Sequence, residues 1–304
     1  MSLHELEEIR KKSKKQNTIG IIILVVSIIM FMFGSGLETF GPIMTVLGFG
    51  GFAAGIVLIA IANAKFSKIK KDFKNKILKA EIEKMYPEIQ YYPDRGLEMG
   101  FVNSLHLYRE PDRYHSEDML CGKIMGVSFV CSDVKMEEKH VEHTKNGTRT
   151  YYETYFQGRF YRFDFNKPFK DTILLTEGMK PGAYGALQKV EMESIDFNKK
   201  FKTYCKEKIN AFYILTPQLM LALLELEKQN PGVVSIVINS NNVYMAINNR
   251  RDSFELSLSR PIDENFLKYY MKDLTSVEQI IDQLNLDNKV FKEIDRDLKS
   301  LNIK

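Results

Sequence analysis

The sequence predicts an α+β protein in which two membrane-spanning helices and a linker helix precede a mostly antiparallel sheet domain with C-terminal helices. Two long apolar runs near the N-terminus predict the helical hairpin, strand-like alternation predicts the sheet, and helical spacing returns towards the C-terminus. We therefore expect a basic N-terminal segment at 1–17, a transmembrane hairpin at 18–64, a linker helix at 65–88 and an α+β domain at 89–304.

The two apolar runs have the length of transmembrane helices. The first is 18–37 and the second is 40–64, and neither contains a charged residue. At about 1.5 Å per residue, a run of about 20 residues spans the hydrocarbon core of a bilayer, which is about 30 Å thick. A cleaved signal peptide has a shorter apolar core. A helical hairpin buried in a soluble protein carries more polar positions, so the transmembrane interpretation is favoured over both.

Basic residues flank the hairpin and predict its orientation. Residues 1–17 carry a net charge of +2 and residues 65–84 a net charge of +5, whereas the link between the apolar runs contains no lysine or arginine. The positive-inside rule then predicts a multi-pass cell-membrane protein with both termini in the cytoplasm. The remaining domain is mildly acidic, so the excess positive charge lies beside the apolar runs. This placement favours the anionic headgroups of the lipid bilayer over nucleic acid as the partner.

The linker predicts an amphipathic helix, in which Phe66, Ile69, Phe73, Ile77 and Ala80 recur at helical spacing. We expect its apolar face to pack on the soluble domain, while its N-terminal half could also touch lipid. The residues expected to contact the membrane surface are Lys65, Lys68, Lys70, Lys71, Lys74 and Lys76.

Small residues in the second apolar run predict close helix packing. Gly48, Gly51 and Gly55 recur at spacings of three and four, which permits close approach of another helix. That helix is either the other half of the hairpin or, in a homo-oligomer, a second copy of the chain.

The region after the linker predicts antiparallel strands. A strand at 123–143, a turn at 145–147 and a return strand at 148–165 form a hairpin, in which Gly158 is the expected bulge. Further strands are expected at 171–177, 189–193 and 200–207, and a short one at 254–258.

Helices alternate with one more hairpin in the C-terminal third. Thr216 and Pro217 predict the start of a helix that ends at Gln229. Residues 233–248 predict a hairpin that turns at 240–242. Two final helices are expected at 262–284, with a break near Thr275, and at 288–301.

Several separated motifs resemble a known family. FQGRFYRFDFNKPFKDTILL (156–175), the segment 213–217 and the strand 243–247 occur in the order and spacing of the bacterial domain of unknown function 3137 family. The resemblance spans about 116–286. It implies a bacterial inner-membrane protein with an N-terminal hairpin, and it supplies no catalytic residue.

Known catalytic and cofactor motifs are missing from the sequence. There is no phosphate-binding loop, GxSxG, HExxH or GxGxxG motif, so no catalytic residue is assigned and no cofactor is expected. His140 and His143 are three positions apart (i and i+3) on a strand and should point to opposite faces, which argues against a metal site. Asp164 is expected to cap the following turn rather than to act as a base. Cys121, Cys131 and Cys205 are expected to be reduced thiols.

An aromatic strand, 151–165, carries Arg159 and Arg162 and resembles a base-stacking surface, but the acidic domain favours ordinary packing in a sheet. Two functions remain open. The first is a non-enzymatic interaction or scaffold module at the cytoplasmic membrane surface, bound to a membrane protein or to another copy. The alternative is a membrane-tethered enzyme with an unrecognised active site.

Overall fold

The computed structural model describes residues 3–34, 40–145, 147–178, 187–262, 265–284 and 286. It divides into two compact units, which are described separately. The first contains residues 1–80 and 254–269, and the second contains residues 81–253 and 270–304. The C-terminal helix expected at 288–301 lies outside the described residues.

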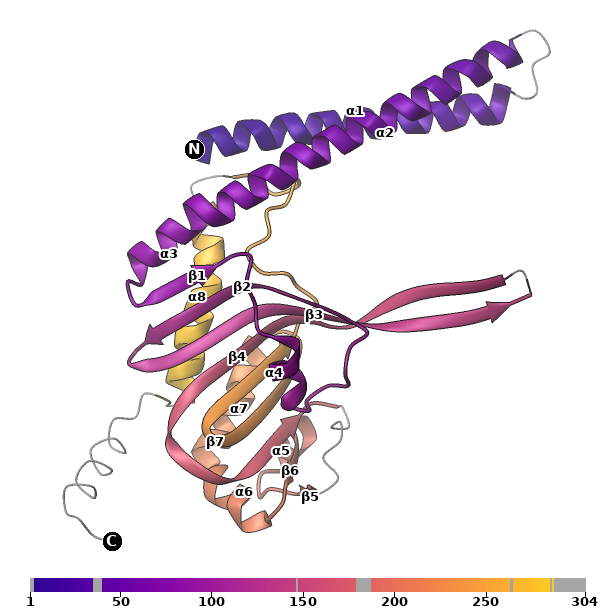
Figure 1. The fold of residues 1–304 in the computed structure, drawn as a ribbon. Coiled ribbons are helices and arrows are strands. Elements are labelled where there is room, and N and C mark those ends of the chain that lie inside the picture. Colours follow the sequence, from indigo (N-terminus) through magenta and orange to yellow (C-terminus); the bar gives the residue numbers. More distant parts are fainter. Residues whose placement is uncertain are drawn as a thin grey trace. The chain divides into compact units, whose positions relative to one another are not determined.

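The first unit is built on two long helices, α1 (Leu3–Gly34) and α2 (Gly41–Asp72), which lie side by side (Figure 1). By length and composition, the helices that cover 3–33 and 41–85 could each cross a membrane. The bent pair α6 (Lys208–Ile214) and α7 (Pro217–Gln229) would count as a third if taken as one span. Helix α1 begins well before the apolar run, because its polar N-terminal turns contain no glycine or proline that would end it.

Close packing between α1 and α2 depends on glycine. A Cβ atom at Gly55 would lie 2.9 Å from Leu24 Cγ and 3.0 Å from the carbonyl oxygen of Gly20. A Cβ atom at Gly51 would lie 2.5 Å from Ser27 Oγ, and one at Gly48 would lie 3.1 Å from the ring of Phe31. The predicted small-residue face of α2 therefore lies against α1 within the same hairpin.

The linker continues α2 without a break, through a π-helix, η1 (Phe73–Leu78), into α3 (Lys79–Met85). Phe73 and Leu78, five residues apart, are both buried, whereas Ile77 is only half-buried. A π-turn brings residues five apart onto one face. The prediction that Ile77 and Ala80 continue the buried face is therefore wrong. After Phe73 the buried residue of this face is Leu78.

A segment from late in the chain completes the first unit. Phe254, Leu256 and Ile262 are buried, although 254–258 forms no strand, contrary to the prediction. The guanidinium of Arg10 donates to the carbonyl oxygen of Leu258, and the backbone N–H of Ile262 donates to Glu7 Oε2 at 2.8 Å. These contacts join the N-terminal turns of α1 to residues almost 250 positions away.

The described residues of the second unit form a seven-stranded antiparallel sheet with helices, so the α+β fold class is confirmed. The strand order is β1-β2-β3-β4-β6-β5, and β7 also pairs with β4. The strands are β1 (Ile89–Tyr92), β2 (Arg113–Ile124), β3 (Val127–Thr144), β4 (Gly147–Thr176), β5 (Gln188–Val190), β6 (Lys202–Cys205) and β7 (Val233–Asn248).

Strand β4 unites two strands that the sequence predicted separately. It pairs with β3 from Gly147 to Phe163 and with β6 from Ile173 to Thr176. The irregularity in its pairing with β3 falls at Tyr155, not at Gly158, which corrects the predicted bulge. Gly158 is needed for another reason, because a Cβ atom there would lie 2.0 Å from the carbonyl oxygen of Ile247 on β7.

Strands β4 and β7 remain paired with one another while both change direction sharply. Between the pairs Asp164–Asn242 and Ile173–Ile238, β4 contains five more residues than β7. Figure 1 shows β4 curving around β7 at this point. The hairpin predicted at 233–248 is wrong, because these residues form the single strand β7, which pairs with β4 on both sides of Ser240. Ser240 bends this strand with φ 52°.

Helices cover the two faces of the sheet. A short helix, α4 (Met99–Ser104), lies on one face, above a core that contains Phe156, Phe160 and Leu174. On the opposite face lie α7 and α8 (Phe266–Gln283), the latter from Tyr270 onward (Figure 1). Helix α5 (Ile195–Lys200) precedes β6. Thr216 caps α7 as predicted, but α8 continues through Thr275 without the expected break.

Candidate functional site

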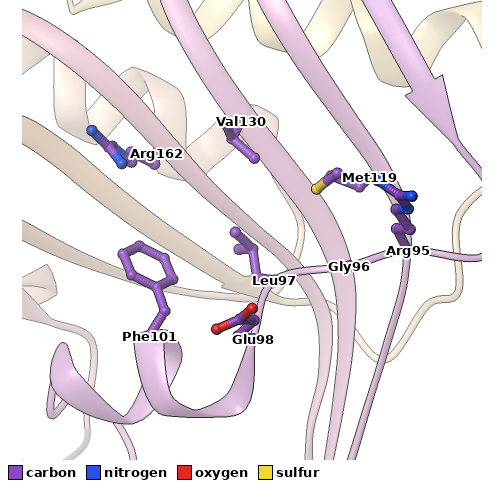
Figure 2. A pocket seen from close by; sticks show the side chains of 8 residues that line it. All are labelled: Arg95, Gly96, Leu97, Glu98, Phe101, Met119, Val130 and Arg162. Carbon is purple, nitrogen blue, oxygen red and sulfur yellow. The ribbon is translucent and has the colours of Figure 1, made fainter.

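A pocket of about 520 Å³ lies on the α4 face of the sheet (Figure 2). Its floor comes from three neighbouring strands, with Met119 on β2, Val130 on β3 and Arg162 on β4. The opposite wall is the segment from Arg95 to Glu98 together with Phe101 of α4. The volume is within the range of small-molecule sites, about 300–1,000 Å³.

The wall of the pocket is fixed by hydrogen bonds to the sheet. The backbone N–H of Leu97 donates to Ser132 Oγ at 3.1 Å, and Tyr114 OH donates to the carbonyl oxygen of Leu97 at 2.7 Å. A Cβ atom at Gly96 would lie 2.0 Å from Ser116 Oγ, so only glycine permits the segment to approach β2 this closely. The wall of the pocket is therefore held in place by contacts with two strands, β2 and β3.

Two arginines lie on opposite sides of the pocket, with Leu97 between them (Figure 2). Arg162 Nε donates to Asn242 Oδ1 at 3.1 Å, and its Nη2 lies 3.4 Å from Asp164 Oδ1. Arg95 stacks over the ring of Tyr92, 5.2 Å from the ring centroid. The pocket thus combines apolar side chains with two positive charges and the single carboxylate of Glu98.

A second exposed feature is the arm, defined as residues 137–144 of β3 and 147–154 of β4. It extends beyond the rest of the sheet (Figure 1). One face carries Glu138, His140 and Glu142 opposite Glu153, Tyr151 and Arg149. His140 stacks on Tyr151 with ring centroids 5.2 Å apart, and its Nε2 lies 3.2 Å from a carboxylate oxygen of Glu138 and of Glu153.

The outer edges of the arm are open over most of its length. Strand β2 reaches only Glu137, and β7 reaches only Arg159. The carboxylate of Asp112 then accepts a hydrogen bond from the backbone N–H of Lys139 at 2.7 Å. Among the described residues, no strand pairs with the outer edges of 141–144 or 147–153. A two-stranded ribbon with open edges offers backbone groups to an added strand.

The predicted membrane-contact lysines divide into two groups. Lys65, Lys68 and Lys71 are exposed on α2, and the exposed Lys76 pairs with Asp72. Lys74 is buried, and both it and Lys70 form ion pairs with Glu255 at 2.6 Å. Burial raises the pKa of Glu255, but hydrogen bonds from Lys70 and Lys74 outweigh that effect, and the net pKa is lowered. A buried ammonium in an ion pair is poorly placed to bind headgroups.

The sequence-predicted candidates His140 and His143 lie on β3, and Asp164 lies on β4. His140 and His143 belong to opposite faces of the arm, and His143 Nδ1 lies 3.0 Å from Thr148 Oγ1. Asp164 lies within β4 and contacts Arg162, so its predicted turn-capping role is wrong. The long strand β4 continues past Asp164, which removes the turn that it was expected to cap.

The aromatic strand is divided between the arm and the core. Tyr151 and Tyr152 lie on the arm, where the guanidinium of Arg113 is 3.4 Å from the centroid of Tyr152. Phe156, Phe160 and Phe163 are fully buried. All three cysteines are free thiols; Cys131 and Cys205 are buried, and Cys121 is half-buried. Burial raises the pKa of Cys121 and Cys205.

One group of carboxylates could hold a cation by geometry. Glu117, Asp118 and Asp252 each have an oxygen within 4.8 Å of the others. Internal contacts already occupy part of this group, since Tyr91 OH donates to Asp118 Oδ1 and His115 Nε2 lies 3.6 Å from Glu117 Oε1. These contacts account for part of the group, and the closeness of the three carboxylates still permits a cation between them.

Sequence reasoning missed the pocket and the ion pairs of Glu255. The pocket residues come from segments up to 67 positions apart, and only Arg162 lies in a stretch that the sequence analysis singled out. Glu255 is 181 positions from Lys74. The sequence signal for the arm was present, since a polar 137–144 segment next to an Asn-Gly turn predicts a hairpin exposed on both faces.

The chain can also be compared with known proteins. No curated protein matches the chain. Among solved structures, the chain is similar to the crystal structure of the mycobacterial trehalose monomycolate transport factor A, TtfA, with 10% sequence identity and a TM-score of 0.37. The match covers 70% of this chain and 97% of that chain, but its TM-score is too low to support an argument about fold or function.

A family model supports the resemblance found in the sequence. The model described as "Protein of unknown function (DUF3137)" matches residues 154–286, which include the C-terminal part of β4 and all of β7 and α8. Two candidate membrane-spanning helices precede this region. Residues 154–286 therefore match the domain of unknown function 3137 family, as the motifs of the sequence predicted.

Proposed function

We propose that this chain is a membrane-anchored, non-enzymatic interaction module that binds a protein partner through its arm. The observation that supports it best is the open-edged ribbon at 137–144 and 147–154. An isolated two-stranded hairpin is only marginally stable in water, and exposed strand edges pair readily with other chains. A partner that adds a strand to one edge satisfies its backbone groups and gains specificity from the side chains.

The chemistry of the arm defines the partner segment. Val141 is exposed, and one face carries Glu138, Glu142 and Glu153, where Arg149 lies opposite Glu142 and Arg109 pairs with Glu138. We infer that the partner is a membrane protein, or a second copy of this chain, that offers an extended segment with basic side chains opposite these glutamates. Cross-strand pairs of opposite charge each contribute about 0.2–1 kcal/mol.

Co-purification from native membranes tests this function. The full chain and a variant in which 138–153 is replaced by a two-residue turn are crosslinked in membranes, solubilised and affinity-purified. We expect a discrete partner, or a crosslinked dimer, with the full chain and its loss with the shortened arm. Lys199→Ala, at an exposed ion pair on α5, is the matched control. Equal recovery with the shortened arm would contradict the proposal.

The anchor places this module at the membrane. We propose a multi-pass protein of the bacterial inner membrane, with both termini in the cytoplasm, and the basic segments beside the hairpin support this orientation. Lys65, Lys68 and Lys71 then form the exposed part of the membrane-contact surface. Fusion of a cytoplasm-dependent fluorescent protein to the C-terminus should fluoresce, whereas a fusion of a periplasm-dependent phosphatase should stay inactive. The reverse pattern would contradict the orientation.

A membrane-tethered enzyme is the second candidate, and the carboxylates of Glu117, Asp118 and Asp252 are the observation that favours it. Isothermal titration of the full chain with Mn²⁺ distinguishes the two. Binding that is lost in Asp252→Asn would favour a metal-dependent reaction, and the absence of binding would favour the interaction module.

A further inference from the structure

The pocket between α4 and the sheet has a chemistry that the arm does not share. Val130, Leu97 and Phe101 present half-buried apolar side chains towards it, although apolar groups at this position could have been fully covered by a longer helix. Helix α4 has only six residues, and Val130 and Arg162, which are paired neighbours on β3 and β4, both line the pocket and are partly exposed. Such a lining favours an apolar ligand.

The two arginines differ in the hydrogen bonds they already make. Arg162 is bound through its Nε to Asn242 and approaches Asp164 with its Nη2. The guanidinium carbon of Arg95 lies 5.2 Å from the centroid of the Tyr92 ring, and a cation–π contact of this kind does not use the N–H groups that can bind an anion. Arg95 is therefore the better anion-binding group of the pair.

Glu98 limits the charge of the ligand. Its carboxylate lies beside Leu97 at the N-terminal end of α4, on the same wall as Arg95 (Figure 2). A ligand with several negative charges would be repelled by Glu98, whereas a single anionic group can lie at Arg95 and remain clear of it. The pocket thus favours one negative charge at one end of an apolar body.

We propose that this pocket binds a single-chain amphiphile with one anionic group, whose chain lies on Val130, Leu97 and Phe101 and whose anion contacts Arg95. The wall is held in place by the Leu97 hydrogen bonds to Ser132 and Tyr114, so little reorganisation accompanies binding. A fatty acid and a lysophospholipid share this chemistry. The inference is independent of the arm and does not rest on the proposed protein partner.

Photolabelling of the full chain in nanodiscs tests the proposal. The probe is decanoic acid with a diazirine near the chain end, added from water to discs of neutral lipid. In a second experiment the probe is a diazirine-bearing lysophosphatidylglycerol, which carries one negative charge and is incorporated in the disc. Mass spectrometry maps the adducts. We expect labelled peptides that contain 95–101 or 119–130, and competition by decanoate or decyl sulfate but not by decanol or decylamine. The probe that labels the pocket, either the free fatty acid or the lipid in the disc, identifies the source of the ligand.

Two variants separate binding from folding. Arg95→Gln should reduce pocket labelling roughly tenfold, the loss expected for one charge-assisted hydrogen bond. Val130→Phe should block labelling by filling the pocket without a change of charge. Arg149→Gln on the arm is the matched control, and unchanged thermal unfolding shows that each variant is folded.

Three outcomes would overturn the proposal. These are adducts confined to the apolar helices at 18–64, pocket labelling that a folded Arg95→Gln variant leaves unchanged, and displacement of the probe by an acidic peptide but not by decanoate. None of them affects the arm, because Arg95 and Val130 lie outside it, so failure here is distinguishable from failure of the proposed function.

Discussion

Arg159 Nε donates a hydrogen bond to Asp133 Oδ1 at 2.6 Å, and both side chains are buried between the central strands β3 and β4. The other oxygen of Asp133 accepts a hydrogen bond from the backbone N–H of Ser253. This pair therefore joins the centre of the sheet to the chain that leaves β7. Removal of one member of a buried ion pair leaves the other charge in a site that water does not reach.

Asp133→Asn should lower the free energy of unfolding by about 3–5 kcal/mol, because the charge of Arg159 then lacks its buried counter-charge. Urea-induced unfolding in detergent, followed by circular dichroism, measures the loss. Asp196→Asn, which removes one partner of an exposed ion pair with Lys199, is the control and should change stability by less than about 1 kcal/mol. Equal effects of the two variants would contradict the role of Asp133.

Gly158→Ala should destabilise the second unit, because the added Cβ atom would collide with the carbonyl oxygen of Ile247. Forced displacement in a packed core costs about 1–3 kcal/mol or more. Gly100→Ala in α4 provides the comparison, since nothing lies within 4 Å of its added Cβ atom, and alanine there should be neutral or stabilising. Similar unfolding midpoints for both variants would show that β4 and β7 do not approach so closely.

The raised pKa of Glu177 predicts that the stability of the folded protein depends on pH. Burial, followed by repulsion from Glu227, raises its pKa from the ordinary 4.5 to about 7, although Lys200 opposes the shift. The folded protein therefore holds this proton more tightly than the unfolded chain does. The resulting stabilisation is fully present below about pH 4.5 and is lost as the pH rises through about 7.

Glu177→Gln should remove this dependence and stabilise the protein at pH 8 by about 1–2 kcal/mol, a value already reduced because the carboxyl group is only half-buried. Unfolding midpoints at pH 5 and pH 8 provide the measurement. Glu225→Gln on the exposed side of α7 should leave the pH dependence unchanged. A Glu177→Gln variant with the wild-type pH profile would contradict the assignment.

The glycines of α2 predict which substitutions disrupt the membrane hairpin. Gly55→Leu should separate α1 from α2, because even its Cβ atom would lie 2.9 Å from Leu24 and 3.0 Å from the backbone of Gly20. Gly50→Leu, on the same helix, is the matched control, since nothing lies within 4 Å of its added Cβ atom. Disulfide crosslinking between engineered cysteines on α1 and α2 should fall in the first variant only. Equal crosslinking would contradict this packing.

Sequence patterns predicted those features that depend on neighbours along the chain. The apolar length of the hairpin, the Thr216 cap and the turn between β3 and β4 each depend on a few consecutive residues. The π-turn at Phe73–Leu78 escaped prediction because helical spacing assumes a constant 3.6-residue turn. Gly158 was assigned to a bulge because its real neighbour, Ile247, lies 89 positions later. The pocket depends on how three strands and α4 meet, which no local pattern encodes.

Site-specific photocrosslinking in intact membranes tests most directly whether the arm binds a protein partner. A photoreactive phenylalanine analogue replaces the exposed Val141 on the arm or, as a control, the exposed Ile195 at the start of α5. Irradiation should give a discrete adduct of defined mass at Val141, or a dimer of this chain, and none at Ile195. The absence of an adduct at Val141, or the same adducts at both positions, would contradict the proposed function.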